Sequence, residues 1–258
     1  MPDSSPLYLA RMTLDAARLM RLAHRQNMPS DETDLGYPLH ALLSELFGKG
    51  TLQPFRALER STRAVSLLGY SRSSAQELQR HAESFADPAA YAACRWETFA
   101  VKPMPSTWPE GRRLGFEVRA CPVVRLANDL QTEHRGRPKT YRRGSELDAW
   151  QHRRWIASEP EEITREQAYT EWLEQRLEEG AQLNWVQLQG FQRVRLARRS
   201  RKPDGRPWKL LERPEAMLRG ELTVRNAAAF SEALASGVGR HAAFGFGMVL
   251  LRPPAPSG

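Results

Sequence analysis

The sequence predicts an α+β protein in which one order of elements, strand, helix, strand, strand, helix, strand, occurs twice. Hydrophobic patterns follow that order in each half, the segment 103–113 between the halves is rich in proline and glycine, and 258 residues with 41% hydrophobic content suffice for two cores. Because this is the order of a ferredoxin-like (RRM-like) domain, we predict two in tandem, over residues 1–105 and 112–258.

The first half begins with residues 6–14, whose alternating pattern predicts a strand, and continues with a helix or turn over residues 15–25. Residues 35–48 predict a helix that ends at Gly48, because four leucines fall on one stripe; Tyr37 and His40 share the adjoining polar face. Two paired strands, a helix opened by Ser73 or Ser74, and a closing strand are predicted over residues 54–59, 63–71, 73–85 and 94–104.

The second half opens with a predicted strand over residues 114–126. Thr164 and Gln167 have the spacing of a capping box and predict a helix over residues 164–180. Two strands, a helix and a final strand are predicted over residues 183–197, 219–226, 227–237 and 244–254. The connection 128–160 is longer than an ordinary loop and rich in charge, so we predict a basic, partly helical insertion with a functional role.

The charge balance indicates a polyanionic partner. The formal net charge is +8 and comes mainly from arginine, whose planar guanidinium pairs with phosphate through two hydrogen bonds. Apolar runs stay below the roughly 18 residues of a membrane helix and the first residues do not have the pattern of a secretory signal, so we expect a cytoplasmic protein without a membrane partner. Cys94 and Cys121 are expected to be buried thiols of a reducing compartment.

Basic residues fall in three clusters interleaved with aromatic side chains, including Trp208, a mixture suited to structured RNA with a single-stranded flank. A solvated basic surface is the alternative for any one cluster, but three clusters in one chain favour nucleic acid. The turn signal at 202–205 also predicts a β-hairpin with basic arms. The candidate RNA-binding residues are Arg135, Arg137, Lys139, Arg142, Arg143, Arg153, Arg154, Arg193, Arg195, Arg198, Arg199, Arg201, Lys202, Gly237, Gly239, Arg240 and His241.

Tyr37 and His40 form the candidate catalytic pair, because two side chains three residues apart on a helix can act on one phosphodiester. An imidazole can deprotonate a 2′-hydroxyl or protonate the leaving 5′-oxygen. A histidine beside an apolar stripe is, however, more often a packed or surface residue than a catalyst. The sequence has no acidic cluster typical of a two-metal nuclease, no P-loop and no GxSxG elbow, so a nuclease would cleave without metal or another cofactor.

The segment 220–253, GELTVRNAAAFSEALASGVGRHAAFGFGMVLLRP, resembles the glycine-rich signature of the CRISPR repeat-RNA endoribonucleases of the RAMP superfamily. Its strand, short helix, G-x-G-R-H, F-G-x-G and final strand follow the order of that signature. YPLH at 37–40 resembles the Y-x-x-H element of the type I-E branch, and the type IV enzymes are similar as well. The likeness spans most of the chain and is weakest over residues 26–36 and 128–160.

The resemblance implies an enzyme that binds the hairpin of the CRISPR repeat RNA and cleaves precursor CRISPR RNA (crRNA) at the 3′ base of that hairpin. Attack by the 2′-hydroxyl would leave a 2′,3′-cyclic phosphate and a 5′-hydroxyl without metal, and the protein would stay bound as a subunit of a CRISPR effector complex. His40 would be the general acid or base, and Tyr37 would orient it or stabilise the pentacoordinate phosphate. In the type IV enzymes arginines can replace the histidine, which adds as catalytic candidates Arg21, Arg25 and Arg240, with His24 as a second base.

Two other functions are compatible with the sequence. One is a RAMP-fold subunit that binds RNA without cleaving it. The other is a general nucleic-acid-binding protein unrelated to CRISPR, against which the glycine-rich signature and YPLH count.

The glycine-rich segment 237–251 can itself be interpreted in two ways. Gly237 and Gly239 suit a helix end followed by a tight turn. A turn alone does not explain Arg240 and His241 within it, or two further glycines at 245 and 247, whereas an RNA phosphate lying against the turn would explain both.

Overall fold

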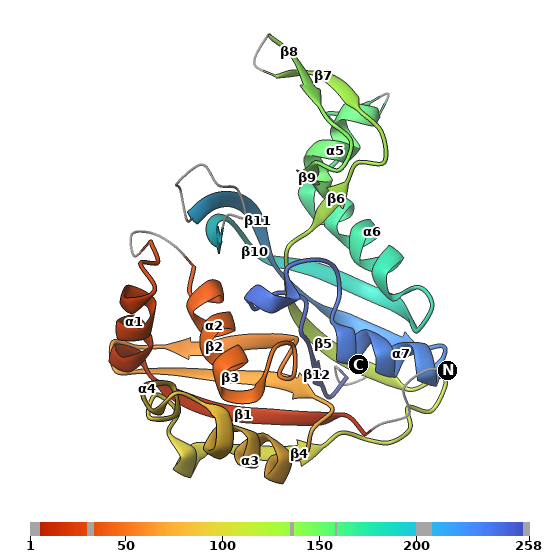
Figure 1. Ribbon diagram of the computed structural model, residues 1–258. Coiled ribbons are helices and arrows are strands. Elements are labelled where there is room, and N and C mark those ends of the chain that lie inside the picture. The colour runs from red at the N-terminus through yellow and green to blue at the C-terminus, as the bar shows by residue number, and fades with distance from the viewer. Residues whose placement is uncertain (1–5, 30–33, 135–136, 158, 200–207, 255–258) are drawn as a thin grey trace.

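The computed structural model describes residues 6–29, 34–134, 137–157, 159–199 and 208–254 (Figure 1). Two four-stranded antiparallel sheets form its frame, with strand orders β2-β3-β1-β4 and β10-β11-β5-β12. In both sheets the order along the chain is second, third, first, fourth, which confirms the predicted pair of ferredoxin-like sheets. The eight strands are β1 (Tyr8–Asp15), β2 (Phe55–Arg60), β3 (Ala64–Ser71), β4 (Ala100–Pro103), β5 (Arg113–Ala120), β10 (Ala181–Arg199), β11 (Trp208–Val224) and β12 (Val249–Arg252).

The helices of the first half cover one sheet through the stripe that the sequence predicts. Leu39, Leu42, Leu43 and Leu46 are all buried, and the helix that carries them ends at Gly48, whose φ of +85° suits a residue without a side chain. The Asp15 carboxylate and a capping box at Ser74 begin two of the helices as predicted. These elements are α1 (Ala16–Arg25), α2 (Gly36–Phe47), α3 (Ala75–Phe85), α4 (Pro88–Tyr91) and η1 (Trp96–Thr98).

The second half packs its helices on the other sheet. The predicted capping box is present, because Thr164 Oγ1 accepts from the Gln167 N–H while the Gln167 side chain accepts from the Thr164 N–H. Tyr169, Trp172 and Phe230 are buried against the strands. The covering helices are α6 (Arg165–Leu177) and α7 (Ala227–Ser236), whereas the short turn η2 (Ala242–Phe244) packs against α2 of the first half.

Three predicted strands are shorter in the structure. The segment 94–104 makes one bridge at Cys94 and then turns as η1, because the Thr98 and Phe99 N–H groups donate to carbonyls three residues earlier; only β4 is extended. The segment 114–126 breaks at Pro122, which has no N–H for the ladder; β6 (Val123–Arg125) then pairs with β9 (Glu146–Asp148). The segment 244–254 extends only as β12, because Gly245 and Gly247 have φ of +83° and +77°.

The strand predicted over 219–226 is part of a much longer one. β10 and β11 pair from Ala181 with Val224 to Arg199 with Trp208, so the arms of the predicted basic hairpin are present. Its turn signal at 202–205 lies outside the described residues. Register shifts at Leu183/Trp185 and Leu188/Gly190 interrupt the ladder.

The predicted insertion projects away from the two sheets (Figure 1). It contains a helix, as predicted, and also a two-stranded ribbon that the sequence pattern did not indicate. Its elements are β7 (Leu130–His134), β8 (Arg137–Tyr141) and α5 (Ala149–Ile156).

Each sheet has a hydrophobic core of its own, and we propose a domain boundary between residues 105 and 112. The two halves also contact each other directly. The Tyr70 hydroxyl of β3 donates to the Val249 carbonyl of β12 at 2.9 Å, and Arg56 of β2 pairs with Glu117 of β5. Within the described ranges, no helix is long and apolar enough to cross a membrane, and both cysteines are buried and free.

Candidate active site and RNA interface

Helix α2 presents Tyr37 and His40 on one face, as their spacing of three residues predicts. Their ring centroids lie 6.0 Å apart, with an angle of 71° between the ring planes, and both side chains are half-buried. The pair is therefore partly shielded from water but open to a substrate.

Two aromatic residues from distant parts of the chain complete the surroundings of this pair. Phe244 of η2 stacks on Tyr37 at 6.1 Å and 22°, and meets the edge of His40 at 5.7 Å and 63°. Trp208 of β11 lies edge-on to Tyr37 at 4.8 Å and 87°. The sequence marked Trp208 as an aromatic residue among basic ones and Phe244 as part of the glycine-rich signature, but neither signal placed them beside Tyr37 and His40.

The surroundings of His40 favour its neutral form. Burial of the imidazole lowers its pKa below the ordinary 6.5, and the positive charge of Lys49 lowers it further. A neutral imidazole carries an unprotonated ring nitrogen near pH 7, so His40 can accept a proton there.

The start of α2 is held by charged groups of the second sheet. Arg119 of β5 pairs with Asp34, just before the helix, and with Glu215 of β11. Asp34 also accepts from the Gly36 N–H at 2.7 Å, and its own N–H donates to the Arg195 carbonyl of β10 at 3.2 Å. The helix with the candidate catalytic pair is thus fixed to the strands of the basic hairpin.

The glycine-rich loop packs against the chain itself. The Val238 N–H donates to the Gly247 carbonyl at 2.8 Å, and the Gly247 N–H donates to the Arg119 backbone carbonyl, also at 2.8 Å. A Cβ atom at Gly247 would lie 2.4 Å from the Val238 carbonyl oxygen, and one at Gly239 would lie 2.5 Å from the Trp172 ring. These contacts and the positive φ of Gly245 give the glycines a structural reason within the chain, and contact of the turn with an RNA phosphate stays a prediction.

Arg240 and His241 converge on a carboxylate of the insertion. Glu146 of β9 pairs with Arg240, with His241 at 3.1 Å and with Arg213 of β11 at 2.9 Å. The hydrogen bond from His241 and the surrounding positive charges outweigh burial and lower the pKa of Glu146 to about 2. Because Arg240 is still 48% exposed while His241 is 11% exposed, Arg240 has more surface to offer an RNA phosphate.

The alternative catalytic residues Arg21, His24 and Arg25 are exposed on α1. The groove between α1, α2 and α4 is lined by Arg25 together with Pro38 and Ala41, which lie on the next face of α2. Among the described residues, no ring contact or hydrogen bond joins the three candidates to Tyr37 or His40. The structure therefore joins Tyr37 and His40 by a ring contact, whereas the catalytic role of the three α1 residues stays a prediction.

The candidate RNA-binding arginines of the β10–β11 hairpin differ in their contacts. Arg198 and Arg199 are exposed at the C-terminal end of β10, and Arg195 is exposed further back along the same strand. Arg193 pairs with Glu212 of β11 at 2.7 Å. Arg201 and Lys202 lie outside the described residues.

The candidates of the insertion divide in the same way. Arg153 pairs with Glu171 of α6 at 3.1 Å, and Arg154 Nε donates to the Pro160 carbonyl at 2.8 Å. Arg135 lies outside the described residues. The exposed candidates on or next to β8 are Arg137, Lys139, Arg142 and Arg143.

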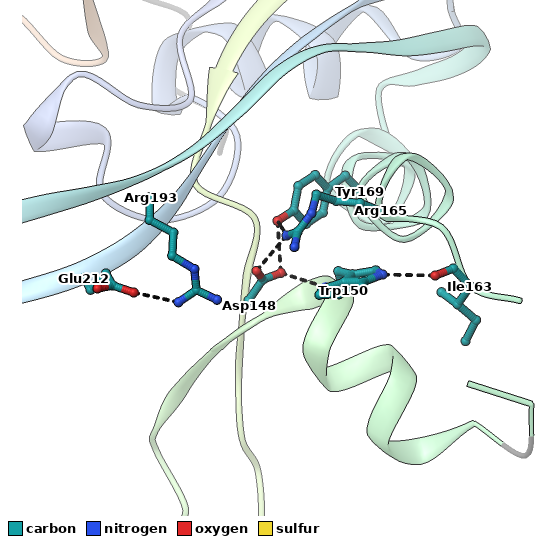
Figure 2. Close-up of polar contacts among 7 residues, drawn as sticks. All are labelled: Asp148, Trp150, Ile163, Arg165, Tyr169, Arg193 and Glu212. Atoms are coloured by element: carbon teal, nitrogen blue, oxygen red, sulfur yellow. Dashed lines mark hydrogen bonds and ion pairs between the residues drawn. The ribbon is translucent and has the colours of Figure 1, made fainter. Parts of the chain in front are cut away.

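Figure 2 shows how the insertion is fixed to the rest of the molecule. The buried carboxylate of Asp148 accepts from Arg165 and from the Tyr169 hydroxyl of α6, both at 3.0 Å. The Arg165 guanidinium also stacks between two rings, 4.1 Å from the centroid of Trp150 and 3.7 Å from that of Phe191 on β10. Hydrogen bonds of Asp148 therefore hold the insertion to α6, and the Arg165 guanidinium connects it through ring contacts to β10.

Within the described part of the chain, no group of three or more histidine, cysteine, aspartate or glutamate side chains is placed to hold a metal ion.

The two tandem ferredoxin-like sheets, with a tyrosine and a histidine on α2 and a glycine-rich loop before β12, define an α+β protein of the tandem ferredoxin-like class. The chain belongs to the CRISPR-associated protein family, which it matches over residues 7–253. No curated protein matches the chain in sequence.

Solved structures share this fold over nearly the whole chain. Cse3 of Thermus thermophilus, bound to an RNA representing a pre-cleavage complex, is 21% identical with a TM-score of 0.60, covering 96% of this chain and 100% of that one. Cas6e of Escherichia coli K-12 is 20% identical with a TM-score of 0.56, covering 95% and 99%. A chain of a CRISPR RNA-guided surveillance complex is 15% identical with a TM-score of 0.56, covering 95% and 99%. At these identities the likeness establishes the fold.

Proposed function

We propose that the chain is a CRISPR RNA-processing endoribonuclease that binds the hairpin of the repeat RNA and cleaves precursor crRNA at the 3′ base of that hairpin. The observation that carries the proposal is the pair of Tyr37 and His40, packed against Phe244 of the glycine-rich loop beside a basic hairpin. The names of the similar structures support it, because they describe a CRISPR endoribonuclease bound to RNA and a CRISPR RNA-guided surveillance complex.

His40 is the proposed general base. Its neutral imidazole accepts the proton of the ribose 2′-hydroxyl, and the 2′-oxygen forms a bond to phosphorus. The bond from phosphorus to the 5′-oxygen breaks, that oxygen takes a proton from water, and the His40 imidazolium returns its proton to the solvent. The products are a 2′,3′-cyclic phosphate and a 5′-hydroxyl, and this proton transfer uses no metal ion.

Tyr37 is the proposed partner of His40, which it either orients or assists by stabilising the pentacoordinate phosphate. Its phenol lies on the same face of α2 as the imidazole, so it can donate to a phosphate oxygen on which charge develops during attack. The stack with Phe244 restricts the tilt of the ring.

The exposed arginines of the hairpin and the insertion are the proposed phosphate contacts, with Arg240, His241, Gly237 and Gly239 beside them in the glycine-rich loop. Guanidinium groups spread over two projecting elements suit the backbone of a folded RNA better than a single compact ligand. We further propose that the protein keeps the cleaved hairpin and takes it into a CRISPR effector complex in the cytoplasm.

The test uses the repeat RNA of the neighbouring CRISPR array in two forms, one all-ribose and one with a 2′-deoxyribose at the cleaved position. The ribose form should be cut to a product ending in a cyclic phosphate, and the deoxy form should bind equally well and stay intact. Tight binding without cleavage of the ribose form would instead favour the RAMP-fold subunit that only binds RNA.

A further inference from the structure

Trp208 occupies the place where the basic hairpin meets the candidate catalytic pair. It is the first residue of β11 and lies opposite Arg199 in the β10–β11 ladder. Side chains of directly opposed residues in an antiparallel ladder are neighbours on one face of the sheet. The indole is therefore the neighbour of an exposed arginine that we propose to contact RNA.

The same indole is in contact with Tyr37. Its ring lies edge-on to the phenol, with centroids 4.8 Å apart, and Phe244 stacks on that phenol at 6.1 Å. Edge-to-face and stacked contacts fix both the distance and the tilt of an aromatic ring. Because Phe244 also contacts His40, a displacement of Trp208 would change the orientation of both Tyr37 and His40.

A second contact supports this connection between hairpin and helix. The Asp34 N–H, two residues before α2, donates to the Arg195 carbonyl on the same hairpin. The hairpin is thus bound to the start of α2 through a backbone hydrogen bond and through an aromatic side chain. The backbone contact needs no particular side chain at 208, so it does not explain why a large ring stands there.

The indole N–H does not explain the residue either. It is buried and has no hydrogen-bond partner among the described residues. An unpaired buried donor destabilises a fold, so what Trp208 contributes is the contact area and shape of its ring. A phenylalanine would keep most of that contact and would remove the unpaired donor.

We propose that Trp208 is a positioning residue that transmits the binding of RNA at the β10–β11 hairpin to the orientation of Tyr37 and, through Phe244, of His40. The inference rests on the proposed function. In that cleavage reaction Trp208 would act through Tyr37 and would not touch the reacting atoms itself. Displacement of a reacting group by about 1 Å can lower a rate by about 10²-fold, so a ring that fixes the phenol affects the chemical step more than binding.

The experiment compares Trp208→Ala, Trp208→Phe and wild type in single-turnover cleavage of the repeat hairpin, together with the Kd for that RNA. Trp208→Ala should cleave about 10- to 100-fold more slowly with a Kd within about threefold of wild type, and Trp208→Phe should stay close to wild type in both. The matched control is Trp185→Ala, which removes a 42% exposed tryptophan of the same hairpin and should cleave normally.

A double-mutant cycle separates positioning from general loosening of the fold. In a Tyr37→Ala background, Trp208→Ala should have little further effect on the rate, because the ring that it positions is gone. Three results would overturn the proposal: normal cleavage by Trp208→Ala, an effect on Kd alone, or a Trp208→Phe variant as slow as the alanine variant, which would give the indole N–H a direct role. Absence of cleavage by wild type would instead refute the endoribonuclease function.

Discussion

Arg119 of the second sheet forms an ion pair with Asp34, the residue two positions before the helix that carries Tyr37 and His40. The candidate active site is therefore assembled by both halves of the chain: α2 supplies the reacting groups, and β5 holds the start of that helix. The same guanidinium lies 4.2 Å from the ring centroid of Phe246, in the glycine-rich loop. One arginine thus joins the residue that precedes α2 to the glycine-rich loop.

Replacement of His40 by alanine should nearly abolish cleavage of the repeat hairpin while leaving its Kd close to wild type. Loss of a general acid or base lowers a rate by about 10²- to 10⁴-fold, and His40 is one side chain in a large interface. Single-turnover kinetics with labelled RNA measures the rate. If the variant cut at the wild-type rate, the arginines of α1 and Arg240 would become the next candidates.

The cleavage rate should depend on pH through His40. As a base the imidazole must be neutral, so the rate should rise with pH up to a pKa below 6.5 and stay constant above it. Lys49→Ala removes one of the two causes that lower this pKa and should move the rising limb to higher pH, whereas Lys49→Arg keeps the charge and the wild-type profile. A rate that falls as pH rises through this range would show that His40 acts as an acid.

Removal of divalent metal should leave cleavage unchanged, because the proposed steps are proton transfers that involve His40 and water. The rate is measured in excess EDTA and again after addition of Mg²⁺, with His40→Ala as the control for contaminating nucleases. Loss of cleavage in EDTA that Mg²⁺ restores would contradict the metal-independent mechanism.

Neutralising Arg198 and Arg199 together should weaken hairpin binding and flatten its dependence on salt. Each lost phosphate contact lowers the slope of log Kd against log salt by about 0.7 to 0.9, so a decrease between about 1 and 2 is expected. Arg198→Gln/Arg199→Gln is compared with Arg80→Gln/Lys102→Gln, which removes the same charge from exposed positions elsewhere. An equal slope for both variants would place the phosphate contacts on other elements.

Gly247→Ala should destabilise the fold more than Gly111→Ala. Both glycines have positive φ, +77° and +80°, so both variants carry the backbone strain of roughly 1–3 kcal/mol. Only at Gly247 would the new Cβ collide with backbone, 2.4 Å from the Val238 oxygen, whereas Gly111 has open space. Urea unfolding measures the free energy of each variant, and equal losses would mean that the loop moves aside without cost.

Local patterns predicted the parts of the fold that local chemistry decides. The leucine stripe of α2, its end at Gly48 and the capping box at Thr164 follow from the spacing of a few neighbouring residues. Pro122 carried a signal of the same kind, since a residue without an N–H cannot continue a ladder, and the unbroken strand expected there was an error of interpretation.

Contacts between distant residues could not be predicted in this way. Trp208 and Tyr37 are 171 positions apart in the sequence, yet their rings are in contact. Arg240 likewise pairs with Glu146, which belongs to a distant strand, β9. The sequence showed that Arg240 and His241 stand in a turn, but not that the turn faces a carboxylate. The side chains around the candidate site become neighbours only after the two sheets and the insertion have packed.

The anchor at Asp148 has a consequence for protein engineering. A chimera that received residues 128–160 alone would bring a buried carboxylate without Arg165 and Tyr169, which supply its hydrogen bonds from α6. An uncompensated charge in such a place is strongly unfavourable. The smallest transplantable unit is therefore the insertion together with α6. The receiving protein would also need a neighbouring strand with an aromatic ring in the position of Phe191, which contacts Arg165.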